Sequence, residues 1–212
     1  MHRFILLIYL LMITSCKNTD NSNNIKIISE SPYIYYILDE NGMHYFDERF
    51  QQNDTISEIS NSGREYIFNN EIEKAENQIN EGLKIDSLDP ILNNDLANIY
   101  KKDKKFEKSI IHYNKAIKIS DSIYIPPLIN LADLYATLGE QSKSEKIYFY
   151  IINNNKSEIY QGIAFHGLAN MYYKYGYIDK ARSNLKTGKK LVQKDKNILK
   201  KFTELEVKIN QY

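Results

Sequence analysis

The chain has 212 residues, a length that fits one domain or one short repeat array. It carries 28 Lys and Arg residues against 27 Asp and Glu, so no strong net charge attracts nucleic acid or an acidic substrate. Hydrophobic residues make up 42%, which is enough for a core, and the 18 tyrosines suit half-buried helix surfaces.

Residues 1–15 have the pattern of an export signal. A basic start with Arg3 is followed by an unbroken apolar run of ten residues from Phe4 to Ile13. Ten helical residues span about 15 Å, which is roughly half of a bilayer's hydrocarbon core. The run is therefore too short to cross a membrane, and it fits a signal peptide.

The next residues resemble the lipobox of bacterial lipoproteins. The sequence Ile13-Thr14-Ser15-Cys16 places the chain's one cysteine where that family needs it. The resemblance implies cleavage before Cys16, a diacylglycerol thioether on its sulfur and acylation of the new amine. Several buried acyl chains anchor a protein firmly where one does not. The alternative is an ordinary signal peptide with an incidental cysteine.

Residues 16–24 are predicted to form a lipidated tether, because they are small and polar after Cys16 and have nothing to bury. In some lipoprotein families an Asp at the second mature position causes retention at the inner membrane, and this chain has Lys17 there. We therefore expect a lipid-anchored protein of the bacterial cell envelope. The expected site is the outer membrane, on its periplasmic or its surface face.

Residues 25–55 are predicted to be a separate N-terminal segment with a β-hairpin or a small extended structure. The pair Asn41-Gly42 lies between the runs 34–38 and 43–46, which are rich in aromatic and β-branched residues. Asn-Gly between such runs is a strong hairpin signal, because both turn positions tolerate positive φ. A helix fits less well, because Gly42 would lie in its middle.

Five residues recur three times: Leu-Ala-Asn-Ile-Tyr at 96–100, Leu-Ala-Asp-Leu-Tyr at 131–135 and Leu-Ala-Asn-Met-Tyr at 168–172. The spacings of 35 and 37 residues indicate stacked helical hairpins, because one hairpin cannot bury its own apolar face. In register with these motifs, small residues recur wherever paired helices must approach closely. They are Gly63, Ala75, Gly82, Ala97, Ser109, Ala116, Ala132, Ser144, Ala169, Ala181 and Gly188, with Ile151 as the bulky exception.

This pattern resembles the tetratricopeptide repeat (TPR). The resemblance implies an all-α, TPR-type helical-hairpin solenoid over residues 56–193, with Gly139 and Gly176 in turns between paired helices. About four repeats are expected, at 56–89, 90–124, 125–161 and 162–193.

Residues 194–212 are predicted to be a C-terminal capping helix. Ile198, Phe202, Leu205 and Ile209 form one apolar stripe, and lysines cover the other sides. Stacked repeats need such a half-polar cap, because the last hairpin would otherwise leave its apolar face in water.

In TPR proteins the inner helix of each hairpin lines a concave groove that binds peptides. Carried over by the repeat register, the resemblance implies eight groove residues in this chain: Arg64, Asn94, Asn98, Lys101, Asp133, His166, Asn170 and Tyr173. Amide side chains can hydrogen-bond an extended peptide backbone both as donors and as acceptors. The alternative is that Asn is simply common in this chain and has no specific role.

We find no catalytic motif in the sequence. It has no Gly-rich phosphate loop and no Gly-x-Ser-x-Gly turn, and its four histidines are far apart. If Cys16 is lipidated, the sequence indicates no metal site made of Cys and His ligands. We therefore expect no catalytic residues, no metal, no cofactor and no enzymatic activity.

Together these features predict a membrane-anchored envelope lipoprotein that acts as a protein–protein interaction scaffold through a TPR groove. Its expected partner is a protein or an extended peptide of the envelope, and not nucleic acid. Two alternatives stay open. Residues 25–58 could form an enzyme or enzyme-accessory site with the repeats as a frame, and the domain could self-associate through its groove or its cap.

Overall fold

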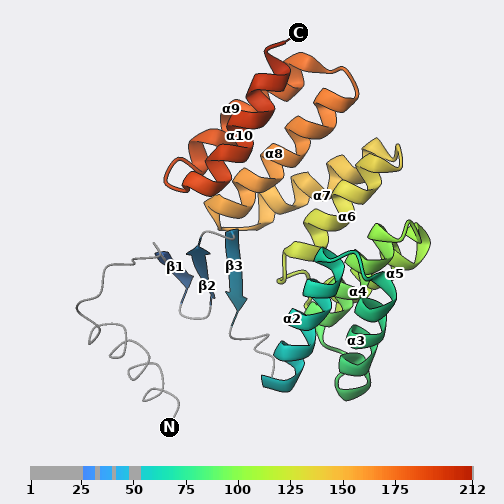
Figure 1. Ribbon diagram of the computed structural model, residues 1–212. Helices are drawn as coiled ribbons and strands as arrows, with labels where there is room; N and C mark the ends of the chain where they lie inside the picture. Colours follow the sequence, from blue (N-terminus) through green and yellow to red (C-terminus); the bar gives the residue numbers. More distant parts are fainter. Residues whose placement is uncertain (1–25, 32–33, 40–41, 48–53, 212) are drawn as a thin grey trace, which may run out of the picture.

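The computed structural model describes residues 26–31, 34–39, 42–47 and 54–211 (Figure 1). The predicted signal peptide, the tether with Cys16 and the predicted Asn41-Gly42 turn lie wholly or partly outside these ranges. The described residues comprise a small sheet followed by a long array of helices.

The sheet has three antiparallel strands in the order β1-β2-β3: β1 (Lys26–Ser31), β2 (Ile34–Asp39) and β3 (Gly42–Asp47). Strands β2 and β3 pair in hairpin register, with Asp39 opposite Gly42. The pairing of β1 with β2 is irregular between Ser29 and Ser31. Strand β1 was not among the elements expected from the sequence, which singled out only the two runs around Asn41-Gly42.

Residues 54–211 form a solenoid of helical hairpins, which confirms the all-α TPR-type fold class expected there. Each hairpin pairs an inner helix with an outer helix, and α10 follows the fourth hairpin (Figure 1). The helix that begins repeat four starts four residues before the expected boundary at residue 162. The bounds are α2 (Asp54–Phe68), α3 (Ile72–Ile85), α4 (Pro90–Lys102), α5 (Phe106–Ile119), α6 (Pro126–Thr137), α7 (Gln141–Asn154), α8 (Glu158–Lys174), α9 (Ile178–Leu191) and α10 (Lys196–Ile209).

Side-chain caps fix where two of the inner helices begin. The carboxylate of Asp89 accepts a hydrogen bond from the Leu92 amide at 2.7 Å, and Pro90 occupies the first helical position of α4. The hydroxyl of Ser157 accepts a hydrogen bond from the Tyr160 amide at the start of α8. Each cap satisfies a backbone donor that the helix itself leaves unpaired.

The turns inside the four hairpins share one backbone conformation. Gly139 and Gly176 have φ values of 85° and 79°, a region that glycine adopts without steric cost. In the first two hairpins Asn70 and Lys104 take the corresponding place, with φ values of 64° and 60°. The same turn is therefore made four times, and the glycine signal in the sequence marked only two of them.

Inner and outer helices approach closely at small residues. Ala97, Ala132 and Ala169, the second residues of the repeated motifs, are all 0% exposed. At the first of these contacts the Ser109 hydroxyl on the outer helix donates to the Ala97 carbonyl at 2.8 Å. A small side chain is needed here, because a larger one would force the helices apart or into strained rotamers.

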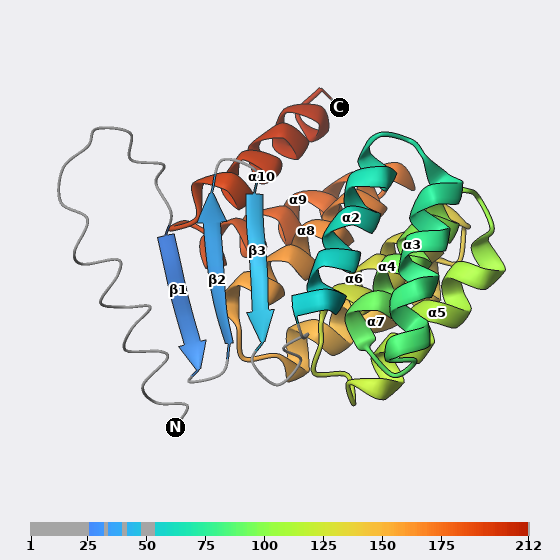
Figure 2. The same ribbon diagram turned by 60° about the horizontal axis from the view of Figure 1, so that its bottom comes forward.

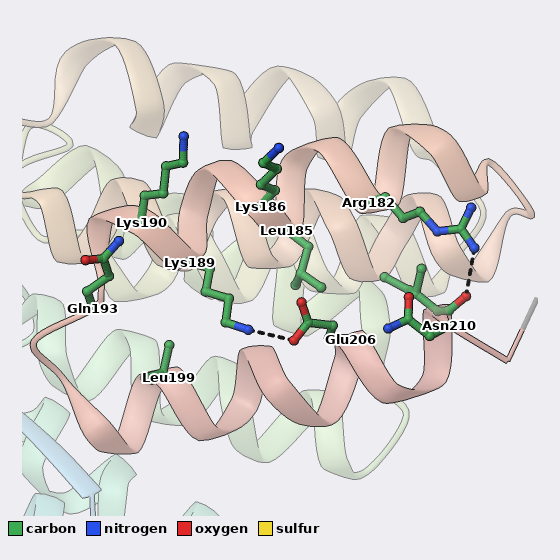
Figure 3. A pocket seen from close by; sticks show the side chains of 10 residues that line it. Arg182, Leu185, Lys186, Lys189, Lys190, Gln193, Leu199, Glu206 and Asn210 are labelled. Atoms are coloured by element: carbon green, nitrogen blue, oxygen red, sulfur yellow. Dashed lines mark hydrogen bonds and ion pairs between the residues drawn. The ribbon is translucent and has the colours of Figure 1, made fainter.

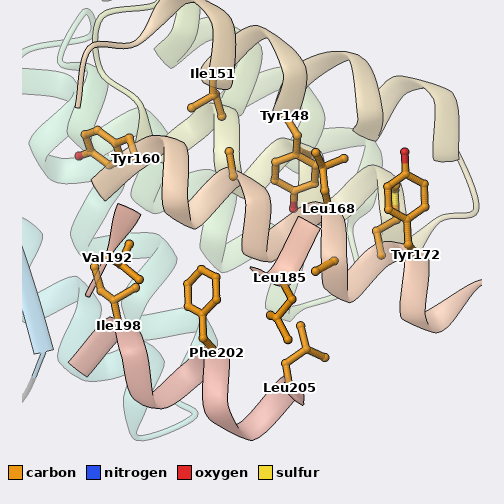
Figure 4. Close-up of a cluster of buried hydrophobic side chains, with 14 of the residues drawn as sticks. Tyr148, Ile151, Tyr160, Leu168, Tyr172, Leu185, Val192, Ile198, Phe202 and Leu205 are labelled. Carbon is orange, nitrogen blue, oxygen red and sulfur yellow. The ribbon is translucent and has the colours of Figure 1, made fainter. Parts of the chain in front are cut away.

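Three hydrophobic clusters follow one another along the solenoid, and the last of them ends at α10. In Figure 4, Tyr148, Leu168, Leu185 and Phe202 lie in one cluster between α7, α8, α9 and α10. Phe202 is 0% exposed, and burying such a side chain stabilises the fold by about 1.5 to 3 kcal/mol. Helix α10 therefore completes the core of the last hairpin, as a cap must.

The close approach predicts a strong effect of Ala169→Trp. An indole at this fully buried position cannot be accommodated between α8 and α9, so we expect destabilisation by roughly 3 kcal/mol or more. For a chain of this size that lowers the Tm by about 6 to 12 °C in circular dichroism. Lys174→Trp, at an exposed position of α8, is the matched control and should leave the Tm nearly unchanged. An unaltered Tm for Ala169→Trp would contradict close packing at this contact.

Candidate functional site

The C-terminal half of the concave face contains a cavity of about 430 Å³. Inner helices α6, α8 and α10 supply most of its lining, and one tyrosine reaches in from the outer helix α7. The lining residues are Ile129, Asn130, Asp133, Tyr148, Ile163, His166, Gly167, Asn170, Ile198, Lys201 and Phe202. The cavity thus combines an apolar floor with amide, carboxylate, imidazole and ammonium groups.

Two of the predicted groove residues are held by tyrosines of the outer helices. The Tyr113 hydroxyl donates to Oδ1 of Asn98 at 2.6 Å, and the Tyr148 hydroxyl donates to Oδ1 of Asp133. Burial raises the pKa of both tyrosines above the ordinary value, so both hydroxyls stay protonated donors. Each bond joins an inner and an outer helix and takes up one acceptor of the groove.

Gly167 allows Tyr148 to cross beneath α8. A Cβ atom at residue 167 would collide with the Tyr148 ring, so only glycine leaves room for it. Tyr148 is 0% exposed as a whole, although its hydroxyl reaches Asp133 on the inner helix α6.

Asn170 differs from its counterparts in the two preceding repeats. Tyr113 and Tyr148 each follow the residue they bind by 15 positions, and the residue 15 positions after Asn170 is Leu185. Leu185 offers no donor, and no hydrogen bond joins the Asn170 amide to another side chain or backbone group in residues 54–211. The amide of Asn170 therefore lines the cavity with both its donor and its acceptor available to a ligand.

His166 connects α8 to α10 at the edge of the cavity. Its Nε2 lies 3.3 Å from the Lys201 carbonyl oxygen, and its ring centroid lies 4.9 Å from that of Phe202. Burial lowers the pKa of His166, and this outweighs the opposing effect of the Lys201 carbonyl. His166 is therefore neutral at pH 7, with Nε2–H as the donor to the carbonyl.

The first two repeats place Arg64 and Asn94 in internal contacts. Arg64 forms an ion pair with the buried Asp95 at 3.0 Å, and the Ser60 hydroxyl donates to the same carboxylate at 2.7 Å. Asn94 is only 4% exposed, and its Oδ1 accepts a hydrogen bond from Asn130 at 3.1 Å. The structure therefore uses both residues to join neighbouring inner helices, and Asn94 lies beneath the surface of the groove.

The other two predicted groove residues, Lys101 and Tyr173, lie in different surroundings. Lys101 places its ammonium 5.9 Å from the centre of the Tyr113 ring, and burial lowers the pKa of Lys101 while Asp133 opposes that change. Tyr173 is half-buried and packs against the core cluster of Figure 4.

The sequence reasoning missed the contribution of α10 to this site. It predicted α10 as a cap, whereas Ile198, Lys201 and Phe202 also line the cavity. A signal was present: Phe202 follows Leu168 by 34 residues and so continues the leucine position of the repeated motif. Helix α10 therefore occupies the place of the inner helix of a fifth repeat.

The arrangement suits recognition of an extended chain. An amide, an ammonium and apolar side chains can bind a peptide backbone and its side chains together. In the described part of the chain no group of three or more His, Cys, Asp or Glu residues is arranged to hold a metal ion. The alternative enzyme site at residues 25–58 lies mostly outside the residues whose side chains are described.

Comparisons with known proteins agree with this fold. Residues 92–122 match the family model described as Tetratricopeptide repeat. PilF of Pseudomonas aeruginosa has a TM-score of 0.61 and 15% identity, covering 75% of this chain and 71% of that one. BtubC from P. vanneervenii has a TM-score of 0.58 and 18% identity, covering 73% of this chain and 74% of that one.

A tetratricopeptide repeat protein from Parabacteroides merdae ATCC 43184 has a TM-score of 0.54 and 18% identity. The match covers 75% of this chain and spans 61% of the length of that protein. No curated protein is similar enough in sequence to match. At these identities the likeness extends to the fold alone, and together with the repeat match it supports a fold of tetratricopeptide repeats.

The neutral state of His166 predicts a pH dependence of stability. Because the pKa of His166 is lowered on folding, the unfolded state takes up the proton first as the pH falls through about 6.5. The contribution of neutral His166 to the free energy of unfolding is complete above that pH and is lost as the pH falls below it. We expect the free energy of unfolding to fall less steeply between pH 7 and 5 in His166→Phe than in the wild type, measured by urea denaturation. Wild type and His166→Phe contain the same carboxylates, so these contribute equally to the pH dependence of both proteins. The same change of stability with pH in both would therefore contradict a lowered pKa of His166.

Proposed function

We propose that this chain is a lipoprotein of the bacterial envelope that holds an extended peptide segment of a protein partner on its concave face. The observation that carries the proposal is the cavity between α6, α8 and α10, with the unpaired amide of Asn170 in its wall. The equivalent residues Asn98 and Asp133 each accept a hydrogen bond from a tyrosine, whereas the Asn170 amide can bond the backbone of a ligand.

The walls of the cavity define the peptide it accepts. Ile129 and Ile163 are partly exposed and provide apolar contacts, so a peptide with apolar side chains at alternate positions would bury those side chains here. Asn170 bonds the peptide backbone from one side, and Lys201 adds a positive charge at the rim. Asp133 would repel a terminal carboxylate, so the segment bound is an internal one.

Membrane attachment is proposed from the sequence at Cys16. Among the residues that the structure describes, no helix is both long and apolar enough to cross a bilayer. The resemblance of residues 13–16 to a lipobox supplies an anchor of a different kind. Anchoring would confine the groove to a thin layer and raise its effective concentration for partners in that layer.

The anchor predicts labelling of one residue. Cells that express the full-length chain with radiolabelled palmitate should yield a labelled protein, and Cys16→Ala should abolish the label because no other cysteine is present. Ser15→Ala, which retains the sulfur, is the matched control and should remain labelled. Unlabelled wild-type protein would contradict the lipoprotein proposal and leave the groove proposal standing.

The groove predicts a partner that depends on Asn170. After crosslinking in intact cells, we expect the full-length chain to recover a protein partner, and Asn170→Ala to recover about 2- to 12-fold less. That range corresponds to the loss of one neutral hydrogen bond. Asn154→Ala, at an exposed position of the outer helix α7, should recover as much as the wild type.

Two results would count against the groove. One is equal recovery by Asn170→Ala and the wild type. The other is a wild type that recovers no partner above the background of cells without the chain. Circular dichroism of each variant checks that the repeats remain folded.

A further inference from the structure

Charge is segregated between the two ends of the solenoid. Residues 54–89, which form α2, α3 and the following loop, contain nine acidic and three basic residues. Residues 178–211, which form α9 and α10, contain ten basic and four acidic residues. Figure 1 shows these segments at opposite ends of the helical array. The chain as a whole is nearly neutral, but its first hairpin is acidic and the segment formed by α9 and α10 is basic.

The basic end contains a groove of about 570 Å³ between α9 and α10. Figure 3 shows Arg182, Lys186 and Lys190 along α9 at its edge. Lys189 bridges the groove to Glu206 on α10 at 2.6 Å. No ion pair within residues 54–211 includes Lys186 or Lys190, so both retain charge for an outside partner.

This groove lies where the repeat pattern places one more helix. In repeats two to four, an outer helix covers the Ala and Tyr of the inner-helix motif. On α10 the corresponding residues are Thr203, which is exposed, and Glu206, which is partly exposed and lines the groove. Among the described residues no helix packs over this face, and the Lys189 side chain that reaches Glu206 crosses it from α9. A helix from another molecule can therefore pack on α10 at the position of a fifth outer helix.

The acidic end presents a helix of matching chemistry. Asp54, Glu58, Asn61, Glu65 and Phe68 are all exposed and follow one another at intervals of three or four residues. They form one stripe along α2. Phe68 is 87% exposed at the end of that stripe, so its ring can gain burial in an interface.

We propose that α2 of one copy of this chain docks in the α9–α10 groove of a second copy. At 1.5 Å rise per residue, Lys186 and Lys190 are about 6 Å apart along α9 and Glu58 and Glu65 are about 10 Å apart along α2, a difference that long, flexible lysine side chains can span. The carboxylates of α2 pair with the free cations of α9, and Phe68 packs toward the apolar floor around Leu199. The docked helix occupies the position of a fifth outer helix.

The contact joins two different surfaces, the acidic α2 stripe and the basic groove. Two antiparallel copies that each dock α2 in the other's groove make this contact twice and form a closed two-fold dimer, because residue i then meets residue j and j meets i. A pair that makes the contact once keeps a free groove and a free α2, to which further copies can add. The proposal concerns the ends of the solenoid and is independent of peptide binding on the concave face.

Energy transfer between full-length copies tests this association. Donor- and acceptor-labelled chains are mixed in detergent micelles; we expect transfer at about 0.05 M salt and its weakening, by roughly tenfold in affinity, at about 0.5 M. Lys186→Glu with Lys190→Glu should weaken association about tenfold or more, and so should Glu58→Lys with Glu65→Lys. Lys143→Glu with Lys146→Glu on α7 makes the same charge change away from both surfaces and should have little effect.

The charge-swapped chain provides the decisive comparison. It carries all four substitutions, Glu58→Lys, Glu65→Lys, Lys186→Glu and Lys190→Glu, and so restores opposite charges across the contact. We expect it to associate like the wild type. Absence of transfer in the wild type at low salt overturns the proposal, and so does failure of the charge-swapped chain while circular dichroism shows it folded. Binding of an acidic helical peptide to the groove of a chain that stays monomeric would overturn it in favour of another partner.

Discussion

The solenoid depends on close contact between helices at residues with little or no side chain. Ala97, Ala132 and Ala169 are fully buried between inner and outer helices, and Gly188 lies where a Cβ would come within 2.7 Å of the Phe165 Cβ. Such contacts set the distance between helices, and that distance decides which longer side chains can reach across. The groove, the tyrosine bonds and the position of α10 all follow from it.

Residues of the outer helices hold the polar side chains of the concave face in place. Outer-helix tyrosines pass between helices to hold Asn98 and Asp133, so these polar groups serve the fold as well as the surface. The fourth repeat breaks the series with Leu185, and Asn170 is left with an unpaired amide beside the cavity. Because Leu185 stands where the preceding outer helices have a tyrosine, the Asn170 amide is available to a ligand instead of bonding within the fold.

The ends of a repeat array pose a different physical problem from its middle. Each internal hairpin is covered on both sides, whereas an end must meet water or another molecule. Here α10 buries Phe202 against the last hairpin and turns Thr203 and Glu206 outward. The lysines of α9 beside this polar face and the acidic stripe of α2 give the two ends opposite charge. Charge of one sign at each end disfavours contact between like ends.

The sequence by itself determined the hairpins, because their period, their small contact residues and Gly139 and Gly176 are local signals that any stacking must respect. The resemblance of these repeats to the tetratricopeptide repeat also implied that inner-helix residues line a concave face. Only the tertiary structure decided which of them remain available. Asn94 and Arg64 are engaged by Asn130 and Asp95 from other helices, and Lys201 and Phe202 enter the site from α10. These outcomes depend on the rotation and spacing of neighbouring helices, which the pattern along one helix does not contain.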